Sequence, residues 1–334
     1  MKGKYQKIVG AFVLGILIPF LVFQIGAMAL NRRNGKMETV PQTHETDGVQ
    51  QGTKPLQGHI ESNVLVYMPD GQIVSMPMDD YLTGVILAEM STSYEMAALQ
   101  AQAVAARTYA CRRQGEARHP DGSVCTDPGG CQAYVALEDY LDGLGYQDDI
   151  NKARQAAIST HGEILMYHGK YIEATYFSCA GGKTEDAVAV WGVSYPYLRS
   201  VDSPEGEDQH NMVSIELTEE ELENKLGRVL YGEPESWLGW TTYTAGGGVG
   251  TMFFGGQRYQ GAEFRSRLGL ASTAFTLEPT EDGIRITTCG KGHRVGMSQC
   301  GAQAMALSGN TYQEILLHYY PGVSLIKLQG IAAD

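Results

Sequence analysis

The sequence predicts an α+β protein in which an N-terminal transmembrane helix precedes one mixed helix-and-strand domain outside the cytoplasm, with a substrate groove. Three observations predict this class. They are an uncharged apolar run near the N-terminus, short strand-like segments bounded by turn residues, and longer capped segments with apolar residues at helical spacing. The 334 residues are 43% hydrophobic and 19% charged, which is ordinary for a protein with a real core.

The apolar run extends from Ile8 to Leu30 without a charged residue. About 20 apolar residues suffice to cross a bilayer, whereas the apolar part of a cleaved signal peptide has only about 7–15. The run therefore favours an uncleaved anchor at 1–33, although Ala27-Met28-Ala29 would serve as a cleavage site. Residues 34–59 are polar and without periodicity, as in a flexible linker. The sequence thus predicts a single-pass protein of the cell membrane.

Residues 60–328 are expected to form the functional domain, with an insertion or minor lobe at 202–250. Turn residues, caps and periodicity locate its elements. We expect strands at 63–67 and 72–76 around an Asp70-Gly71 turn, a helix at 81–89 capped by Asp79 or Asp80, helices at 94–113 and 149–160, a hairpin at 163–177 turning at His168-Gly169, a helix capped at Thr218, strands at 275–277 and 283–287, a helix at 299–307, and a last helix capped at Thr311.

The overall charge limits the class of ligand. The net charge of −13 argues against nucleic acid, because binding to nucleic acid depends on neutralising phosphates with Lys and Arg. A neutral carbohydrate is not excluded. The 41 glycines, and 19 tyrosines against 8 phenylalanines, suit a loop-rich fold with polar aromatic side chains in a groove.

Glu89 is the candidate general acid. It shares a helical stripe with Leu82, Val85 and Ile86, so its carboxyl should face the core and lose hydration. Loss of hydration raises the pKa of a carboxyl, which suits a proton donor near neutral pH. On spacing alone a structural glutamate, paired with an arginine such as Arg107, remains open.

Four motifs follow one another along the chain. Two are the block from Tyr81 through Glu89 to Ala110 and the segment Ser178-Cys179-Ala180-Gly181-Gly182-Lys183-Thr184-Glu185. The others are Gly292-His293-Arg294-Val295-Gly296-Met297-Ser298-Gln299-Cys300-Gly301-Ala302 and Tyr319-Tyr320-Pro321-Gly322. In this order they resemble the stage II sporulation protein D family, which also includes amidase-enhancer domains, and the resemblance covers about residues 60–325.

The resemblance implies a lytic transglycosylase that cuts peptidoglycan glycan strands already stripped of stem peptides, during engulfment in sporulation. It places Glu89 at the family's catalytic position. It also implies two partners, a cell-wall amidase and a multi-pass membrane protein of the engulfment machinery. A transglycosylase needs only one acid because the nucleophile is the sugar's own C6 hydroxyl, and no second carboxylate with an evident role accompanies Glu89, although Glu185 and Asp186 stay open.

Arg107 matches a helix-borne arginine of the family. It could bind a sugar hydroxyl or a lactyl carboxylate, hold Glu89, or donate to loop carbonyls within the fold. Further substrate-binding candidates lie in the family-like segments. Arg294 stands where the family usually has glycine, Cys300 where an aromatic residue is common, and Cys179 where a small hydroxyl residue is common. The further candidates are Tyr176, Ser178, Lys183, His293, Ser298, Gln299 and Tyr320.

His119, Cys125 and Cys131 follow one another at intervals of six residues in a segment rich in proline and glycine. One imidazole and two thiolates suit Zn²⁺, and some members of the resembled family carry zinc in this loop. Water, Asp127 or Glu89 would complete a tetrahedral site. The alternative is a Cys125–Cys131 disulfide, which an exported protein could form.

Two other functions stay open. A zinc amidase could use the three ligands with Glu89 as base. A non-catalytic glycan-binding scaffold could recruit or activate an amidase, and would tolerate the loss of the Glu89 carboxyl.

Overall fold

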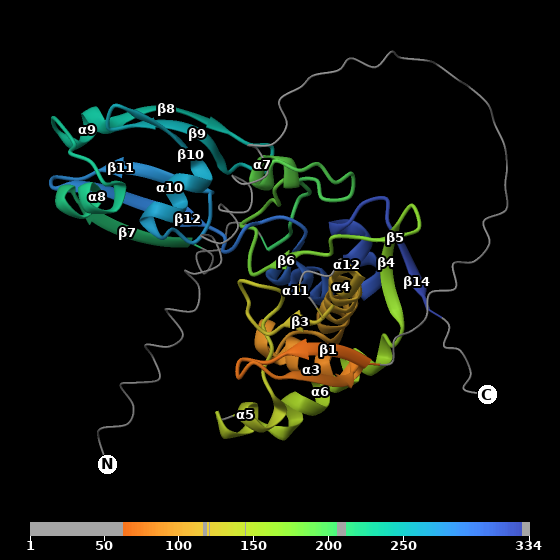
Figure 1. Ribbon diagram of the computed structural model, residues 1–334. Coiled ribbons are helices and arrows are strands. Elements are labelled where there is room, and N and C mark those ends of the chain that lie inside the picture. Colours follow the sequence, from red (N-terminus) through yellow and green to blue (C-terminus); the bar gives the residue numbers. More distant parts are fainter. Residues whose placement is uncertain (1–62, 116–118, 120, 144, 206–211, 329–334) are drawn as a thin grey trace, which may run out of the picture.

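The computed structural model describes residues 63–115, 119, 121–143, 145–205 and 212–328. This part of the chain is a mixed helix-and-strand protein with two lobes, each with its own hydrophobic core (Figure 1). No helix within it is long and apolar enough to cross a membrane. The anchor expected at 1–33 and the linker at 34–59 lie outside the described residues and stay predictions.

The larger lobe is built around one central helix, α4 (Met96–Gly115) (Figure 1). Seven of its 20 residues are alanine, so neighbouring elements can approach it closely from several sides. A helix without a continuous polar face belongs in the interior of a domain. The elements packed against it are α3 (Met78–Glu89), α6 (Gln147–Ser159), β4 (Glu163–Tyr167), α11 (Gln299–Leu307) and α12 (Tyr312–Tyr319).

Arg107 of α4 joins α6 to α3. Its side chain is buried and donates to the carbonyl oxygens of Ala157 (2.9 Å) and Thr160 (2.8 Å) at the C-terminal end of α6. It also pairs with Asp79, at 3.1 Å. Asp79 was expected as an N-cap, but α3 begins earlier, after Pro77, and leaves this carboxylate in the first turn. A cation at one helix end and an anion at the other both suit the helix dipoles.

Of the two hairpins expected from the sequence, the first is present as expected and the second is shorter. β1 (Asn63–Tyr67) and β2 (Ile73–Pro77) pair antiparallel around Gly71, at φ 86°, which confirms the expected hairpin. The second hairpin turns as expected at His168-Gly169, but β5 (Lys170–Tyr171) ends early. β6 (Tyr176–Phe177) instead pairs in parallel with β13 (Met297–Ser298), so the expected hairpin to residue 177 is wrong. Local propensity cannot reveal a partner more than 100 residues away.

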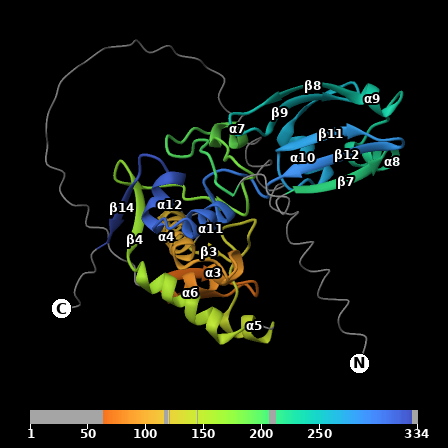
Figure 2. The ribbon, with the colours of Figure 1, turned by 180° about the vertical axis from the view of Figure 1, so that it is seen from behind.

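The smaller lobe contains two antiparallel three-stranded sheets, β10–β9–β8 and β11–β12–β7 (Figure 2). Its core extends from Leu217 to Ile286, so this lobe continues well past residue 250, where the sequence placed its end. Short strands, interrupted by turns and by an acidic, irregular stretch, concealed it. Its elements are β7 (Met212–Thr218), α8 (Glu219–Leu226), α9 (Pro234–Trp237), β8 (Leu238–Tyr243), β9 (Val249–Phe254), β10 (Gln257–Gln260), α10 (Gly261–Leu268), β11 (Phe275–Pro279) and β12 (Gly283–Cys289).

A buried ion pair fixes the smaller lobe to the larger one. Arg294 and Glu185 are 2% and 1% exposed, with Nη1 and Oε1 3.3 Å apart. Glu185 accepts the N–H of Gly248 (2.9 Å), and Arg294 donates to the carbonyl of Gly246 (2.8 Å), so both hold the loop between β8 and β9. Arg294 has φ 64°, a conformation that favours glycine, and its buried hydrogen bonds offset the strain.

The remaining expectations are met with small shifts in boundaries. Thr218 and Thr311 cap α8 and α12 as expected, and the structure adds that each forms a capping box, with Glu221 and Glu314 respectively. Four short helices were not foreseen: α5, α7, α9 and α10. The elements not yet named are β3 (Val124–Cys125), α5 (Leu137–Asp142), α7 (Ala187–Trp191) and β14 (Ser324–Lys327).

We expect Arg107→Ala to lower the free energy of unfolding by about 3–5 kcal/mol, because Asp79 and buried carbonyl groups lose their donor. Urea denaturation followed by circular dichroism measures this change. Arg154→Ala is the matched control, since Arg154 lies 3.9 Å from Asp80 in an exposed pair and its loss should cost less than about 1 kcal/mol. Equal midpoints for the two variants would contradict the structural role of Arg107.

Candidate active site

Glu89 is the last residue of α3, a helix whose residues from Tyr81 to Leu87 are all buried. The carboxyl is itself partly buried, and no basic residue lies in the last turn of the helix. The C-terminal end of a helix carries partial negative charge, which disfavours a second negative charge there. The position of the carboxyl at the helix end and its burial therefore both disfavour its charged form.

Burial raises the pKa of Glu89 above its ordinary value of 4.5. Two hydrogen bonds oppose the effect without cancelling it: the backbone N–H of Ala133 donates to Oε1 at 2.9 Å, and the side chain of Gln299 is the second partner. The carboxyl is thus held in a fixed orientation while its protonated form is favoured. This combination suits a proton donor near neutral pH.

A row of neutral hydrogen-bonding side chains lies beside this carboxyl. Tyr176 donates to Oε1 of Gln132 at 2.7 Å, and Nε2 of Gln132 donates to the hydroxyl of Tyr81 at 3.1 Å. Burial, and secondarily the charge of Glu89, raise the pKa of Tyr176 well above its usual value. Tyr176 therefore remains an un-ionised phenol near the acid.

The pairing of β6 with β13 brings the middle and C-terminal motifs together. Met297 lies opposite Tyr176, and the next residues, Ser298 and Gln299, begin α11. Gln299 contacts Glu89 and also Gln102 of the central helix, at 3.5 Å. The site is therefore assembled from the end of α3, the loop at 131–133 and this two-strand pairing.

Ser298 caps the start of α11 and fixes Glu205 beside it. Its hydroxyl oxygen accepts the N–H of Gly301 (3.1 Å) as an N-cap and donates to Oε1 of Glu205 (2.7 Å). Sequence reasoning did not single out Glu205, which comes from the irregular stretch after the middle motif and also accepts the N–H of Ala180 at 2.7 Å. Only the folded chain brings it to Ser298.

His293 is neutral in this fold. Burial, aided by the charge of Arg265, lowers the pKa of His293 to about 4. Nδ1 accepts the N–H of Val295 at 3.1 Å, and the ring contacts Phe177 and Trp191. The ring also hydrogen-bonds the backbone of Tyr176, so His293 supports the strand beside the acid.

The structure places the other predicted substrate-binding residues in two groups. Ser178 accepts the N–H of Cys300 through its carbonyl at 2.9 Å and lies in the β6–β13 region, while the Lys183 side chain is exposed near the lobe junction. Arg107 and Tyr320 are buried, and Tyr320 donates to the carbonyl of Thr175 at 2.8 Å. For these two the structure corrects the expectation, because side chains enclosed in this way do not line a surface groove.

The remaining acids named from the sequence are engaged elsewhere. Glu185 belongs to the lobe junction, and Asp186 accepts the N–H of Ser200 at 2.9 Å. Cys179 and Cys300, the two departures from the family's usual residues, form a disulfide with 5.1 Å between their Cα atoms. The disulfide joins the segment after β6 to the first turn of α11. The substrate groove itself stays a prediction.

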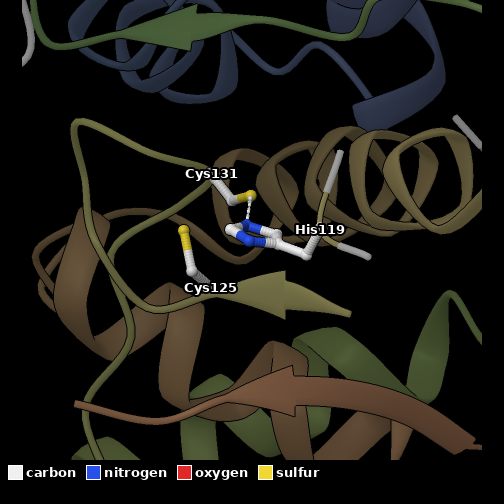
Figure 3. A group of neighbouring side chains, drawn as sticks. All are labelled: His119, Cys125 and Cys131. Atoms are coloured by element: carbon white, nitrogen blue, oxygen red, sulfur yellow. Dashed lines mark hydrogen bonds between the residues drawn. The ribbon is translucent and has the colours of Figure 1, made fainter. Parts of the chain in front are cut away.

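His119, Cys125 and Cys131 come together as a cluster (Figure 3). Their ligand atoms all lie within 4.8 Å of one another, and Sγ of Cys131 is 3.7 Å from Nε2 of His119. Cys125 and Cys131 are thiols, so the disulfide alternative is not what the structure contains. A hydrogen bond from Cys131 is the main cause that lowers the pKa of Cys125 to about 5, against the effect of burial.

This donor set fits Zn²⁺. With Zn–S of about 2.3 Å and Zn–N of about 2.05 Å, two ligands on one tetrahedral ion lie roughly 3.6 Å apart, close to the separation of Cys131 and His119. Gly130 is needed here because a Cβ on it would come within 2.5 Å of the Cys125 sulfur. Among the described residues the cluster holds these three ligands, and the Glu89 carboxyl lies outside it.

Three consecutive residues connect the cluster to the acid. Cys131 belongs to the cluster, Gln132 bonds Tyr176 and Tyr81, and the N–H of Ala133 holds Glu89. A change in the position of Cys131 would therefore be transmitted to the acid over a very short length of backbone.

The chain is similar to known sporulation proteins. A family model described as "Stage II sporulation protein" matches residues 70–167. Stage II sporulation protein D of Bacillus amyloliquefaciens is 34% identical over 327 residues, covering 95% of this chain and 93% of that protein. Its counterpart in Bacillus subtilis is 35% identical over 295 residues, covering 84% and 85%.

A more distant similarity has a different name. The protein called "Amidase enhancer" of Bacillus subtilis is 29% identical over 302 residues, covering 73% of this chain but only 40% of that protein.

We expect Gln299→Leu to raise the pKa of Glu89 further. The hydrogen bond from Gln299 stabilises the charged carboxylate, and the variant removes it. Infrared difference spectroscopy of the carboxyl band against pH measures the shift. Gln303→Leu, on the same helix, is the control, since that amide accepts from the N–H of Glu95 and its loss should leave the titration unchanged. A downward shift in Gln299→Leu would show that Gln299 does not stabilise the Glu89 carboxylate.

Proposed function

Because this chain belongs to the stage II sporulation protein D family, whose members act in sporulation, we propose that it is a peptidoglycan lytic transglycosylase. It would cut glycosidic bonds in glycan strands already stripped of stem peptides, during engulfment, and leave 1,6-anhydro ends. The observation that carries the proposal is the partly buried Glu89 carboxyl, with its raised pKa, at the end of α3.

The proposed reaction uses one carboxyl twice, first as an acid and then as a base. The Glu89 carboxyl donates its proton to the glycosidic oxygen, the bond from that oxygen to C1 breaks, and the sugar acquires oxocarbenium character. The donated proton stays on the leaving hydroxyl; the C6 hydroxyl of the same sugar then attacks C1, and its proton passes to the Glu89 carboxylate. No water is consumed, and the enzyme ends in its starting protonation state.

The neighbours of Glu89 support both halves of this cycle. Burial favours the protonated carboxyl before bond cleavage, whereas the N–H of Ala133 and the amide of Gln299 stabilise the carboxylate formed afterwards. An acid with a pKa near the working pH can both lose and regain a proton. Tyr176, neutral and fixed by Gln132, adds a polar wall without a competing charge.

We further propose that His119, Cys125 and Cys131 hold Zn²⁺, on the donor set and spacing of the cluster. When bound, the ion would supply a structural crosslink among the three ligands. Through Gln132 and Ala133 that crosslink would keep the loop at 131–133 in place beside Glu89.

The similarity to a protein named amidase enhancer favours one other function, a glycan-binding scaffold that activates an amidase without cutting the strand. A zinc amidase has less support, since the Glu89 carboxyl lies outside the metal-ligand cluster and holds the loop N–H instead. Product analysis separates all three, because only a transglycosylase makes anhydro ends and only an amidase frees stem peptides.

The cellular setting is proposed on the same basis. A single-pass anchor at 1–33 would hold the domain outside the cytoplasm at the cell membrane. A cell-wall amidase would supply the stripped strands, and a multi-pass membrane protein would localise both enzymes.

Wild-type protein incubated with peptide-stripped glycan should release fragments with 1,6-anhydro ends, identified by mass. Glu89→Gln should lower the rate by about 10²–10⁴-fold, because a carboxamide cannot donate the proton. Activity should fall as the pH rises past the raised pKa of Glu89, where the carboxyl loses its proton. Glu95→Gln, exposed at the start of the next helix, is the control. Undiminished cleavage by Glu89→Gln would contradict the proposal.

Purified wild-type protein should contain one zinc ion per chain by elemental analysis. Cys125→Ser and Cys131→Ser should each weaken zinc binding at least about tenfold, since even loss of an outer contact to a ligand costs 10–100-fold. Cys289→Ser lies outside the cluster and should retain the metal. Zinc retained by a Cys125→Ser/Cys131→Ser double variant would contradict this assignment.

A further inference from the structure

The sheet β10–β9–β8 of the smaller lobe has an outer face that the reaction above does not use. Along β9, Met252 and Phe254 point into the core, so Phe253 and Thr251 point outward. The strand register extends this outer row to both neighbours. We call it the aromatic face, and its side chains are Trp240 and Thr242 of β8, Thr251 and Phe253 of β9, and Arg258 and Gln260 of β10.

Two aromatic rings form the centre of this face. Trp240 and Phe253 are 52% and 36% exposed, with ring centroids 6.4 Å apart and planes within 24° of parallel. At this separation the rings are offset, so each leaves part of its own surface open to solvent. Exposed aromatic groups of this kind mark binding surfaces.

The three strands that form this sheet contain no acidic residue. The chain has 38 acidic residues against 25 basic ones, yet the three strands contain no Asp or Glu and one cation, the exposed Arg258. In the chain, the nearest acids flank the sheet in α9 and α10, at Glu235 and Glu263. Arg258 lies directly opposite Phe253, and the hydroxyl of Thr251 donates to Gln260 at 3.2 Å.

This chemistry matches an acidic polysaccharide better than an apolar protein surface. A sugar ring offers a C–H face that stacks on an aromatic ring and hydroxyl edges that bond to amides and hydroxyls. The outward positions contain no aliphatic side chain, which a hydrophobic protein contact would favour. A lactyl carboxylate, as on the muramic acid of peptidoglycan, is a natural partner for Arg258.

We propose that the aromatic face is a second glycan-binding site, which holds a peptidoglycan strand by stacking its sugars on Trp240 and Phe253 and pairing a carboxylate with Arg258. The ligand is taken from the proposed function, while the binding itself needs no cleavage. The loop between β8 and β9 is fixed to the larger lobe by Glu185 and Arg294, so the face is firmly connected to the lobe that bears Glu89. A strand held here stays with the enzyme between cuts.

The test measures binding of the full chain carrying Glu89→Gln, so that strands stay intact, by co-sedimentation with purified peptide-stripped glycan. In this background we expect Trp240→Ala/Phe253→Ala to weaken binding about tenfold or more, the loss of one strong contact. Tyr231→Ala is the control, since this side chain is 80% exposed in the same lobe but outside the face, and it should bind as the parent does.

Two further variants keep the result interpretable. Trp240→Tyr/Phe253→Tyr keeps an aromatic ring at both positions. It should retain most of the binding even if the alanine pair unfolds the lobe. Arg258→Gln should weaken binding to strands bearing lactyl carboxylates and leave binding to neutral chitin oligomers unchanged. An effect of equal size on both polymers would overturn the pairing with a carboxylate.

Parent-like glycan binding by a folded Trp240→Ala/Phe253→Ala variant would overturn the proposal and leave the face to a protein partner. The outcome is separable from the fate of the proposed function. Binding through the face without anhydro products would remove the transglycosylase and keep this site. Anhydro products with unchanged binding in the alanine pair would do the reverse.

Discussion

The feature on which the rest of the site depends is a carboxyl whose charged form is disfavoured by burial. Glu89 is partly buried at the negatively polarised end of α3, without a basic residue in the last turn to offset either effect. Its two hydrogen-bond partners come from remote segments, the loop at 131–133 and the start of α11. Each supplies a donor to an oxygen without adding a full positive charge that would force ionisation. The protonated form thus survives while the group keeps one orientation.

The architecture explains how remote segments meet at one point. The alanine-rich α4 allows α3, α6, α11 and α12 to approach its axis closely, and Arg107 joins two of them from inside. The short parallel pairing of β6 with β13 then brings Tyr176 beside Ser298 and Gln299. The Cys179–Cys300 disulfide joins the same two segments one step further on. The site is consequently a product of long-range packing, with the metal-ligand cluster stabilising the one loop that contributes to it.

Much of the fold could be predicted from local pattern. The Asp70-Gly71 hairpin, the capping boxes at Thr218 and Thr311 and the stripe containing Glu89 are all written in a few adjacent residues. The failures share a cause. The pairing of β6 with β13, the second core reaching Ile286, the contact of Glu205 with Ser298 and the buried positions of Arg107 and Tyr320 depend on partners far along the chain. Residue type alone could not separate a buried Arg107 from one that binds substrate, because both need the same hydrogen-bond donors.

The central claim is that the Glu89 carboxyl stays protonated above the pH at which an ordinary glutamate ionises. Carbon-13 NMR titration of the side-chain carboxyls tests it most directly, with the Glu89 resonance assigned by its disappearance in Glu89→Gln. The account predicts a midpoint clearly above 4.5 for this resonance, while solvent-exposed glutamates titrate near that value. A midpoint at or below 4.5 would mean that the neighbouring donors outweigh burial, and Glu89 would then be an ionised structural residue rather than an acid.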